Sequence, residues 1–249
     1  MKKVKILKTI ISEISLEETA EVLTSSKNMT VAVCNANSLV RSYRDEDINK
    51  ILNNFDLALP DGFPVAKASS ILYKNKQKRV DGYKIFNETI KKGLSSNTSH
   101  YFYGNSEEVI LALISKLQNA YPNVNISGYD CPPVSSYDKL SSTYYQKLIS
   151  DLNPDIVWVS LGFPKQEKVI SNLAESEKIT SNLVGIGFAI EWVAGTKKKA
   201  PEFLANIGFE WLFRLIQEPK RLYKRYLIDN SLFIIYFLKQ ISLNYKEKI

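Results

Sequence analysis

Apolar runs rich in β-branched and aromatic residues recur along the first four fifths of the chain, separated by longer polar-apolar stretches. Runs of this kind are typical of short buried strands. They predict six strands, at "TVAVCNA" (30–36), "FDLALP" (55–60), "HYFYGN" (100–105), "VNISGY" (124–129), "DIVWVSLG" (155–162) and "NLVGIGF" (182–188).

The stretches between these runs have helical spacing. In "SEEVILALISKLQNA" the apolar residues fall at 109, 110, 112, 113, 114 and 117, which outlines one broad buried face. Regular alternation of strands and helices predicts an α/β fold, a Rossmann-like, mostly parallel sheet with helices on both faces. Ligands of such sheets bind at the carboxyl ends of the strands, so residues just after each strand are the first candidates for a site.

The amino-terminal segment "MKKVKILKTIISEIS" begins with two lysines, as a signal peptide would. Lys5 and Lys8 interrupt its apolar stretch and Glu13 follows, so we interpret it as a first strand. The longest apolar run elsewhere, "LFIIYFL" at 232–238, is far short of the roughly 18 residues that a membrane span requires.

The pattern changes near Gly195 and Thr196, and we divide the chain there. Residues 1–195 are the body, which we expect to be the α/β catalytic domain. Residues 196–249 are the appendage, whose pattern is helical throughout. Pro219 is expected to open a helix, because proline suits the first helical turn. Basic residues then follow at helical spacing among apolar ones.

Composition is that of a globular protein, with 45% hydrophobic and 24% charged residues in 249. The charge is uneven: residues 197–249 hold 11 Lys plus Arg against 5 Asp plus Glu, whereas residues 1–196 hold 22 against 21. A basic appendage indicates an anionic partner, either a membrane surface or nucleic acid. The two cysteines, Cys34 and Cys131, lack CxxC spacing, so we expect neither a disulfide framework nor a zinc site, and a reducing cytoplasm fits best.

Acid-base chemistry in this chain would depend on carboxylates. The single histidine, His100, opens a strand without a nearby Cys, Asp or Glu cluster, and we interpret it as a surface or strand-end residue. Asp61 follows the strand "FDLAL" and is the leading candidate for a base. An Asp-Gly pair after a strand is also a common turn, so the motif alone does not decide between the two interpretations.

Other strand ends support a site. They carry Asn35 and Asn37 in "CNANSL", Arg79 in "KRVDGY", Gly104 and Asn105 in "YFYGNS", and Gln166 in "SLGFPKQEK". Several polar or glycine-bearing termini at one edge favour a common site over unrelated turns.

Two glycine-bearing segments suggest phosphate binding at helix amino ends. In "FYGNSEE", Ser106 is expected to cap a helix, and "GIGF" contains Gly185 and Gly187. Neither is a complete fingerprint, since Ile190 stands where a dinucleotide site has its third glycine, and no Walker A motif is present.

Two alternative functions stay open. One is a nicotinamide-dependent oxidoreductase. The other is a nucleic-acid-binding protein that uses the basic appendage, although no RRM, KH or zinc-finger signature supports it.

Together these segments resemble the WecG/TagA/CpsF family of bacterial glycosyltransferases (glycosyltransferase family 26), from about Asn35 to Leu227. The motifs are "NANSLVRSYRD", "ALPDGFPV", "RVDGYKIF", "DIVWVSLGFPKQE", "VGIGFAIEWVAGTKKKAP" and "GFEWLFRLIQEPKRLYKRYL". The last is the most specific, because its order of charged, aromatic and proline residues has no generic structural cause.

The resemblance implies an inverting transfer of a sugar from a UDP-sugar to a polyprenyl-diphosphate-linked sugar acceptor, in the synthesis of a surface polysaccharide or teichoic-acid-type polymer. It implies no cofactor and no metal. Asp61 would be the catalytic base, with Asn35, Gln166 and Arg79 also catalytic. We expect the substrates to contact Asn37, Gly62, Gly104, Asn105, Gly162, Lys165, Gly185, Gly187, Glu191, Arg214, Arg221 and Arg225.

The resemblance also implies a peripheral protein at the cytoplasmic face of the membrane, with the appendage on anionic lipid and no nucleic acid bound. Apolar residues around Trp211 to Ile216 could instead pack between subunits, so a homo-oligomer stays open. Two positions depart from the family. Val33 stands where teichoic-acid members have threonine, so N-acetylmannosamine is not fixed as the donor sugar. Lys199 replaces an arginine, which keeps the charge without the bidentate fork.

Overall fold

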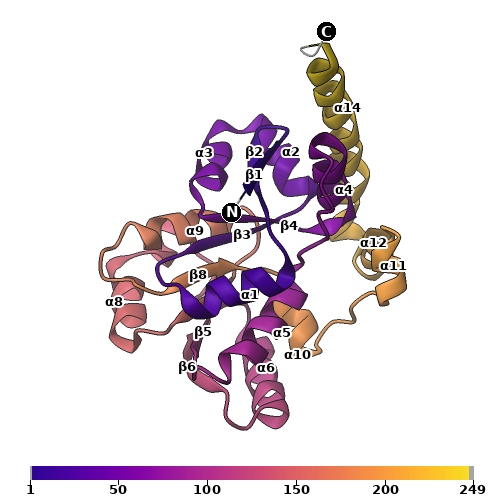
Figure 1. Ribbon diagram of the computed structural model, residues 1–249. Helices are drawn as coiled ribbons and strands as arrows, with labels where there is room; N and C mark the ends of the chain where they lie inside the picture. Colours follow the sequence, from indigo (N-terminus) through magenta and orange to yellow (C-terminus); the bar gives the residue numbers. More distant parts are fainter. Residues whose placement is uncertain (1, 247–249) are drawn as a thin grey trace.

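The computed structural model describes residues 2–246 and is organised around a six-stranded sheet (Figure 1). All strand pairs in this sheet are parallel, in the order β4-β3-β8-β7-β5-β6. The predicted α/β fold is confirmed. The strands are β3 (Thr30–Cys34), β4 (Leu57–Pro60), β5 (Ser99–Gly104), β6 (Asn125–Asp130), β7 (Ile156–Ser160) and β8 (Asn182–Gly185).

Helices cover both faces of the sheet, which explains why the central strands are apolar on both sides. All five residues of β7 are buried. One face packs against α1 (Leu16–Ser25), α5 (Gly82–Gly93), α6 (Glu107–Ala120) and α10 (Ala189–Ala194). The other packs against α2 (Ala36–Arg44), α3 (Glu46–Asn54), α8 (Thr143–Leu152) and α9 (Lys165–Ala174). Two shorter or more peripheral helices of the body are α4 (Gly62–Tyr73) and α7 (Tyr137–Leu140).

The strand order places a crevice at the carboxyl edge of the sheet. From β5 the chain continues outward to β6, whereas from β7 it continues in the opposite direction to β8. Neighbouring strands whose connections diverge in this way leave an opening between their loops. The loops after β5 and β7, which contain Asn105 and Gly162, therefore border the expected binding region.

The amino-terminal segment differs from the prediction of a single strand. It forms a separate antiparallel hairpin of β1 (Lys2–Ile6) and β2 (Thr9–Glu13), in which Val4 pairs with Ile11. Leu7 makes the turn in the left-handed conformation, with φ of 55°, and no glycine marks that position in the sequence. The prediction was wrong because the usual turn residues are absent there.

His100 lies near the start of β5, as interpreted, but it is not a surface residue. It is 1% exposed, and its Nδ1 accepts a hydrogen bond from Trp158 Nε1 at 3.2 Å. Burial lowers the pKa of His100 to about 4, so the imidazole is neutral in the core. The residue that covers it, Trp158, belongs to the neighbouring strand β7, so the sequence of β5 alone could not show that His100 is buried.

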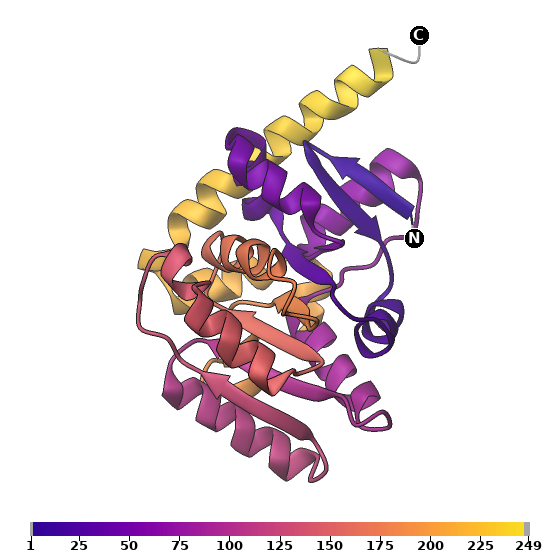
Figure 2. The same ribbon diagram turned by 90° about the vertical axis from the view of Figure 1, so that its left-hand side faces the viewer.

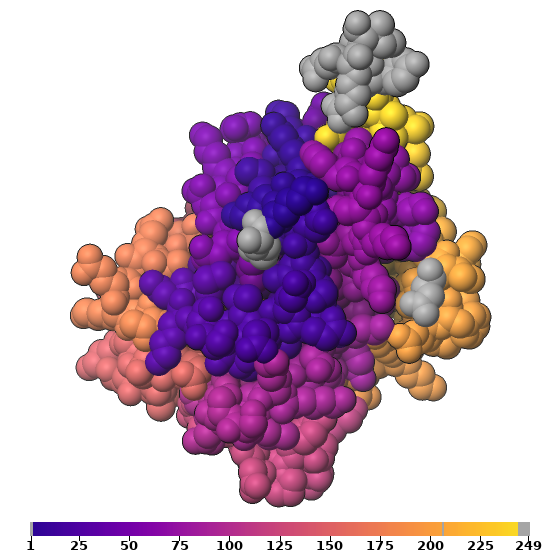
Figure 3. All heavy atoms as spheres, in the orientation of Figure 1, coloured from indigo at the N-terminus to yellow at the C-terminus, as the bar shows by residue number. Residues whose placement is uncertain are grey.

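From Glu202 to Lys246 the appendage is helical apart from breaks at 207–209 and at Glu218, whereas residues 196–201 are not helical, contrary to the prediction of helix throughout. It comprises α11 (Glu202–Asn206), α12 (Glu210–Gln217), α13 (Pro219–Tyr223), a π-helical segment η1 (Lys224–Asp229) and α14 (Asn230–Lys246). Pro219 is the first residue of α13, as predicted. In Figure 3 the orange atoms of α11 and α12 form a bulge on the right-hand side of the molecule.

The last helix, α14, lies along α2, where Tyr236 stacks on Tyr43 with ring centroids 4.5 Å apart. Farther along, Gln240 accepts a hydrogen bond from Leu7 N and donates one to Lys5 O. Figure 2 shows the yellow α14 passing beside the indigo hairpin. Among the described helices, none combines the length and apolarity needed to cross a bilayer.

Candidate active site

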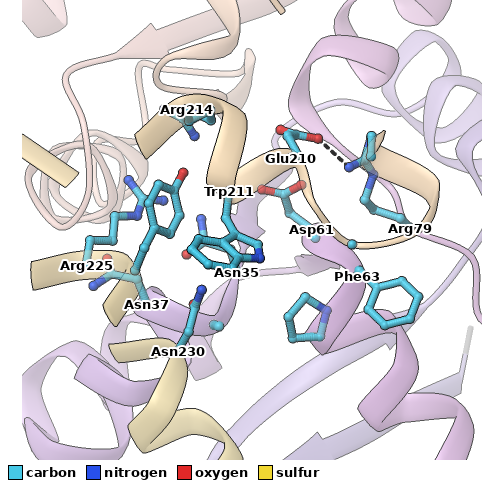
Figure 4. Close-up of a pocket in the computed structure, with 16 residues that line it drawn as sticks. Asn35, Asn37, Asp61, Phe63, Arg79, Glu210, Trp211, Arg214, Arg225 and Asn230 are labelled. Atoms are coloured by element: carbon cyan, nitrogen blue, oxygen red, sulfur yellow. Dashed lines mark hydrogen bonds and ion pairs between the residues drawn. The ribbon is translucent and has the colours of Figure 1, made fainter. Parts of the chain in front are cut away.

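A cavity of about 750 Å³ opens at the carboxyl edge of the sheet, between the body and the appendage. We call it the main cavity. A smaller side cavity adjoins it, and Figure 4 shows the residues that line this side cavity. The two cavities share Asn35, Asn37, Asp61, Arg214 and Arg225. They therefore form one continuous site to which both parts of the chain contribute.

Asp61 lies where the two cavities meet. It follows β4 and stands at the cap position of α4, with its backbone N donating to Cys34 O at 2.8 Å. Its carboxylate makes no capping hydrogen bond with the helix. Burial raises the pKa of Asp61 to about 6, and the nearby charges of Asp81 and Glu210 add to the rise. A half-buried carboxylate without a structural partner is suited to accept a proton near neutral pH.

Arg79 lines the side cavity between two carboxylates. Its Nη2 lies 2.8 Å from Asp81 Oδ2, and its Nη1 lies 2.5 Å from Glu210 Oε2. Asp81 also caps α5, where its Oδ1 accepts a hydrogen bond from Lys84 N at 2.9 Å. Arg79 is thus fixed by one partner from the body and one from the appendage.

Two asparagines at the start of α2 border both cavities. Asn35 caps the helix, with Ser38 N donating to its Oδ1 at 3.3 Å, so the side chain is held at the end of β3. Asn37 donates from Nδ2 to Asp229 Oδ2 in η1. The second contact joins the body to the appendage directly at the site.

Gln166 lies beneath the main cavity and is 4% exposed. Its Nε2 donates to Glu167 Oε1 at 2.9 Å, and burial raises the pKa of Glu167 to about 7. Gly185 and Gly187 make room for Gln166, because a Cβ on Gly185 would lie 3.0 Å from Nε2 and one on Gly187 3.2 Å from Oε1. Both glycines line the main cavity, and their close approach to Gln166 gives them a packing reason beyond phosphate binding.

Cations from the appendage cover the main cavity. Arg214 lies 4.6 Å above the ring of Phe188 and 4.9 Å above that of Trp192, and Arg221 lies 4.9 Å above Phe188. These rings belong to the loop after β8 and to α10, next to Glu191. Within the part of the chain that the structure describes, neither Arg214 nor Arg225 forms an ion pair, which leaves both guanidinium groups available to an anion.

Most of the residues predicted from the sequence meet at this site. Fourteen of the sixteen line one or both cavities: Asn35, Asn37, Asp61, Gly62, Arg79, Asn105, Gly162, Gln166, Gly185, Gly187, Glu191, Arg214, Arg221 and Arg225. Gly62 and Arg79 line the side cavity, and Asn105 and Gly162 line the main one.

Gly104 and Lys165 lie outside both cavities. A Cβ on Gly104 would lie 2.6 Å from Leu161 Cδ2, so close packing of the β5 and β7 ends requires glycine there. Lys165 Nζ donates to Ser135 O at 3.1 Å and lines a neighbouring hollow. Ser106 stands at the cap position of α6 but makes no side-chain capping bond, contrary to the prediction. Its backbone N instead donates to Asn105 Oδ1 at 2.8 Å.

Sequence reasoning missed several residues of the site, chiefly Glu210, Trp211 and Tyr226 from the appendage and Asp81 from the body. The Asp-Gly pair in "RVDGY" is the same signal that singled out Asp61 and could have indicated Asp81. The appendage residues do not follow strands, so the strand-end argument could not find them. Among the described residues, no group of three or more His, Cys, Asp or Glu is placed to hold a metal ion.

Comparisons with known proteins agree with this geometry. A model described as "Glycosyl transferase WecG/TagA/CpsF family" matches residues 4–247. A Bacillus subtilis protein named N-acetylglucosaminyldiphosphoundecaprenol N-acetyl-beta-D-mannosaminyltransferase is 32% identical over 192 residues, which are 77% of this chain and 72% of that protein. Proteins of the same name from Bacillus spizizenii and Staphylococcus aureus are 28% and 27% identical, over 80% of this chain and 75% and 76% of their own.

Proposed function

The chain belongs to the WecG/TagA/CpsF family of glycosyltransferases, and from this premise we propose that it transfers a sugar from a UDP-sugar to a polyprenyl-diphosphate-linked amino sugar. The observation that carries the proposal is the position of Asp61, a carboxylate without an ion-pair partner in the described residues, in a cavity bordered by arginines. Membership of this family decides against an oxidoreductase and against a nucleic-acid-binding module.

In the proposed reaction Asp61 is the general base. The hydroxyl of the acceptor sugar gives its proton to the Asp61 carboxylate while its oxygen attacks the anomeric carbon of the donor. The bond between that carbon and the phosphate oxygen breaks, and UDP leaves with the electron pair. Attack from the face opposite to UDP inverts the anomeric carbon. A pKa near 6 keeps the carboxylate mostly ionised at neutral pH yet basic enough to assist.

The main cavity carries the positive charge that two diphosphates need. Two cations on α2 line it from the body and four line it from the appendage: Arg41, Arg44, Arg214, Arg221, Lys224 and Arg225. The departing UDP and the diphosphate of the lipid acceptor are both anions, and fixed cations stabilise the charge that develops on the first. Guanidinium groups are well matched to phosphate because they donate two parallel hydrogen bonds.

We further propose that transfer does not depend on a metal ion. The six cations that line the main cavity can perform the charge neutralisation that a magnesium ion performs in other transferases. The donor sugar is a nucleotide-linked hexosamine by analogy with the names of the relatives. Val33 lines the main cavity and offers no hydroxyl there, so a donor other than N-acetylmannosamine belongs in any test.

We propose that the appendage holds the protein at the membrane surface. Its exposed apolar side chains include Phe203, Ile207, Ile216, Ile234 and Leu238, each more than half exposed. Basic residues surround them, and each Lys or Arg near an anionic membrane contributes roughly 1 kcal/mol to binding. Reversible, peripheral association of this kind brings the site to a lipid-linked acceptor.

The membrane proposal is tested by sedimentation with vesicles of anionic and of neutral lipid. The full chain should sediment with anionic vesicles, and a chain that ends at Gly195 should stay in the supernatant. Equal sedimentation of the two proteins would contradict the proposal.

The proposed reaction is tested by measuring UDP release with a panel of UDP-sugars and a synthetic polyprenyl-diphosphate-linked amino sugar, with and without EDTA. Release with one donor, unchanged by EDTA and at least about 100-fold slower in Asp61→Asn, is the expected result. Full activity of Asp61→Asn would remove Asp61 from the role of base, and loss of activity in EDTA would contradict metal independence.

A further inference from the structure

Glu210 is the first residue of α12 and reaches from the appendage into the side cavity. Its side chain is 20% exposed, and its Oε2 lies 2.5 Å from Nη1 of Arg79, which is 14% exposed. Ion pairs with this little exposure are held more firmly than pairs at the surface, because water competes less for either partner. The contact therefore fixes where the Arg79 guanidinium points.

The other partner of Arg79 cannot redirect it. Asp81 is 3% exposed and is itself fixed, because it caps α5 through Lys84 N and lies 3.9 Å from Lys199 Nζ. Asp81 binds Nη2 of Arg79 and leaves Nη1 to Glu210. Without Glu210, Nη1 would be a cationic donor in a small cavity with no carboxylate from the appendage.

Asp61 is the remaining carboxylate of that cavity. Figure 4 shows the Asp61 carboxylate next to that of Glu210, with Arg79 joined to Glu210 by the dashed line. In the described residues Asp61 has no ion pair of its own, while Asp81 and Glu210 take the guanidinium. A carboxylate that pairs with a guanidinium is a weaker base and has its oxygens occupied.

We propose that Glu210 is a positioning residue that holds the Arg79 guanidinium off Asp61, so that docking of α12 leaves the Asp61 carboxylate free to take the proton of the acceptor hydroxyl. The inference rests on the proposed function, because it concerns the base of that reaction. It gives the appendage a second task besides covering the main cavity with cations.

The charges that face Asp61 all enter this balance. Glu210 from α12 and Asp81 from the start of α5 raise the pKa of Asp61, whereas Arg79 and Arg225 lower it. Two further titratable groups lie close: Tyr226 in η1 and the buried thiol of Cys34 in β3. Loss of the Glu210 charge therefore acts in one direction only. It removes one influence that raises the pKa of Asp61, and it frees Arg79 to lower that pKa further.

The test is a direct titration of Asp61 in the full chain, without substrate. In protein labelled with ¹³C-aspartate, the carboxyl signal of Asp61 is the one missing from Asp61→Asn. We expect its midpoint near pH 6 in the unchanged protein. In Glu210→Gln, which keeps the shape and removes the charge, the midpoint should fall by about one unit. Glu210→Asp, which keeps the charge on a shorter side chain, should give an intermediate value.

Glu202→Gln is the matched control. Glu202 lies on α11, lines neither cavity, and also joins the appendage to the body, through a 2.6 Å ion pair with Lys84. Its loss should leave the midpoint of Asp61 unchanged. An equal fall in Glu202→Gln would mean that general loosening of the appendage is responsible, and an unchanged midpoint in Glu210→Gln would mean that Glu210 does not set the state of Asp61. Either result overturns the inference.

Transfer assays separate this inference from the proposed function. In Glu210→Gln the acid limb of the rate profile should move to lower pH together with the titration of Asp61, which a merely structural role would not produce. If neither the unchanged chain nor Glu210→Gln transfers sugar, but the midpoint of the Asp61 titration is lower in Glu210→Gln, the proposed function fails and the effect of Glu210 on Asp61 stands.

Discussion

In the body, Trp158, Phe86 and Phe102 have no exposed surface, whereas in the appendage Phe203 is 65% exposed and Ile216 is 73% exposed. The two regions have comparable apolar runs in sequence. The difference is that the strands of the body are enclosed by helices on both faces, while the short helices of the appendage each have one face against the body and the other outward.

The contacts that hold the two regions together are correspondingly of a different kind. Inside the body they are apolar side chains packed against the sheet. Across to the appendage, α14 packs apolar side chains such as Phe233 into the core beside α2, whereas the contacts around the site are mostly ion pairs and arginine-aromatic contacts, such as Arg79 with Glu210 and Arg214 with Phe188. Such contacts are directional and individually modest in free energy. Most of the core is made by residues of the body itself, so the body is expected to fold without the appendage, at reduced stability because Phe233 is lost, and the site is not expected to function without it.

Removal of the appendage should have the largest effect. A chain that ends at Gly195 loses Glu210, Arg214 and Arg225 at once, so transfer should fall at least about 1,000-fold. The body should still unfold in one cooperative transition, at a lower temperature than the full chain, since most of its core is retained and only the contribution of α14 is lost. Calorimetry and UDP release measure the two properties. If the truncated chain shows no unfolding transition, the body does not fold without the appendage, and the loss of transfer would then report misfolding rather than an incomplete site.

Asp61→Asn should separate activity from stability within the body. Transfer should fall about 100-fold or more, as above, while the melting temperature at pH 7.5 should rise. The pKa of Asp61 is raised from 3.8 to about 6 on folding, so its ionisation opposes folding as pH rises through 6. Below about pH 4 both states are protonated, and the gain should vanish there. Each kcal/mol corresponds to about 2–4 °C for a chain of this size. A lower melting temperature at pH 7.5 would indicate a structural turn rather than a base.

Arg225→Gln should weaken transfer while leaving the body unaffected. Removal of a single cation from the main cavity is expected to cost about 100-fold in the rate of transfer, and Arg225→Lys should restore part of it because the charge returns without the fork. Lys239→Gln, on the exposed face of α14, is the control, because it removes the same positive charge at a position that does not line the main cavity. Equal losses in Arg225→Gln and Lys239→Gln would show that net charge rather than position matters.

The smallest effect is expected for the exposed apolar surface. Ile234→Ser on α14 should weaken sedimentation with anionic vesicles about tenfold, because Ile234 is 57% exposed and burying that part of it contributes roughly 1.5 kcal/mol. Transfer to a water-soluble acceptor should not change. Leu111→Ser, at a position 48% exposed on α6, is the control from the body and should leave vesicle binding unaltered. Matching losses from both variants would mean that the appendage has no special relation to the membrane.

The sheet could be predicted from the sequence because each of its strands is a short apolar run bounded by polar residues. β7 is the clearest example, since all five of its residues are buried and "DIVWVSLG" contains them. The strand order was not predictable, because β3 pairs with both β4 and β8 and nothing local distinguishes these partners. The hairpin was missed for a local reason, the left-handed Leu7 in place of a glycine.

The residues of the site that directly follow strands could be predicted from the sequence. Asp61, Asn35 and Gln166 all follow strands of one parallel sheet, whose geometry places them at one edge. Glu210 and Trp211 escaped that argument, because they lie on a short helix whose docking depends on contacts with residues more than a hundred positions away, such as Arg79. Periodicity describes which face of a helix is apolar and does not specify which surface the helix meets.

The hydrogen bonds of Gln240 with Lys5 and Leu7 join the last helix to the first hairpin, and they bear on how the protein is made. A ribosome adds about 5–20 residues per second, so the appendage emerges roughly 3–11 s after the body is complete. During that interval the hairpin lacks α14, and Asp61 has neither Glu210 nor the arginines of the appendage. A nascent chain therefore has an incomplete site until the appendage has been added.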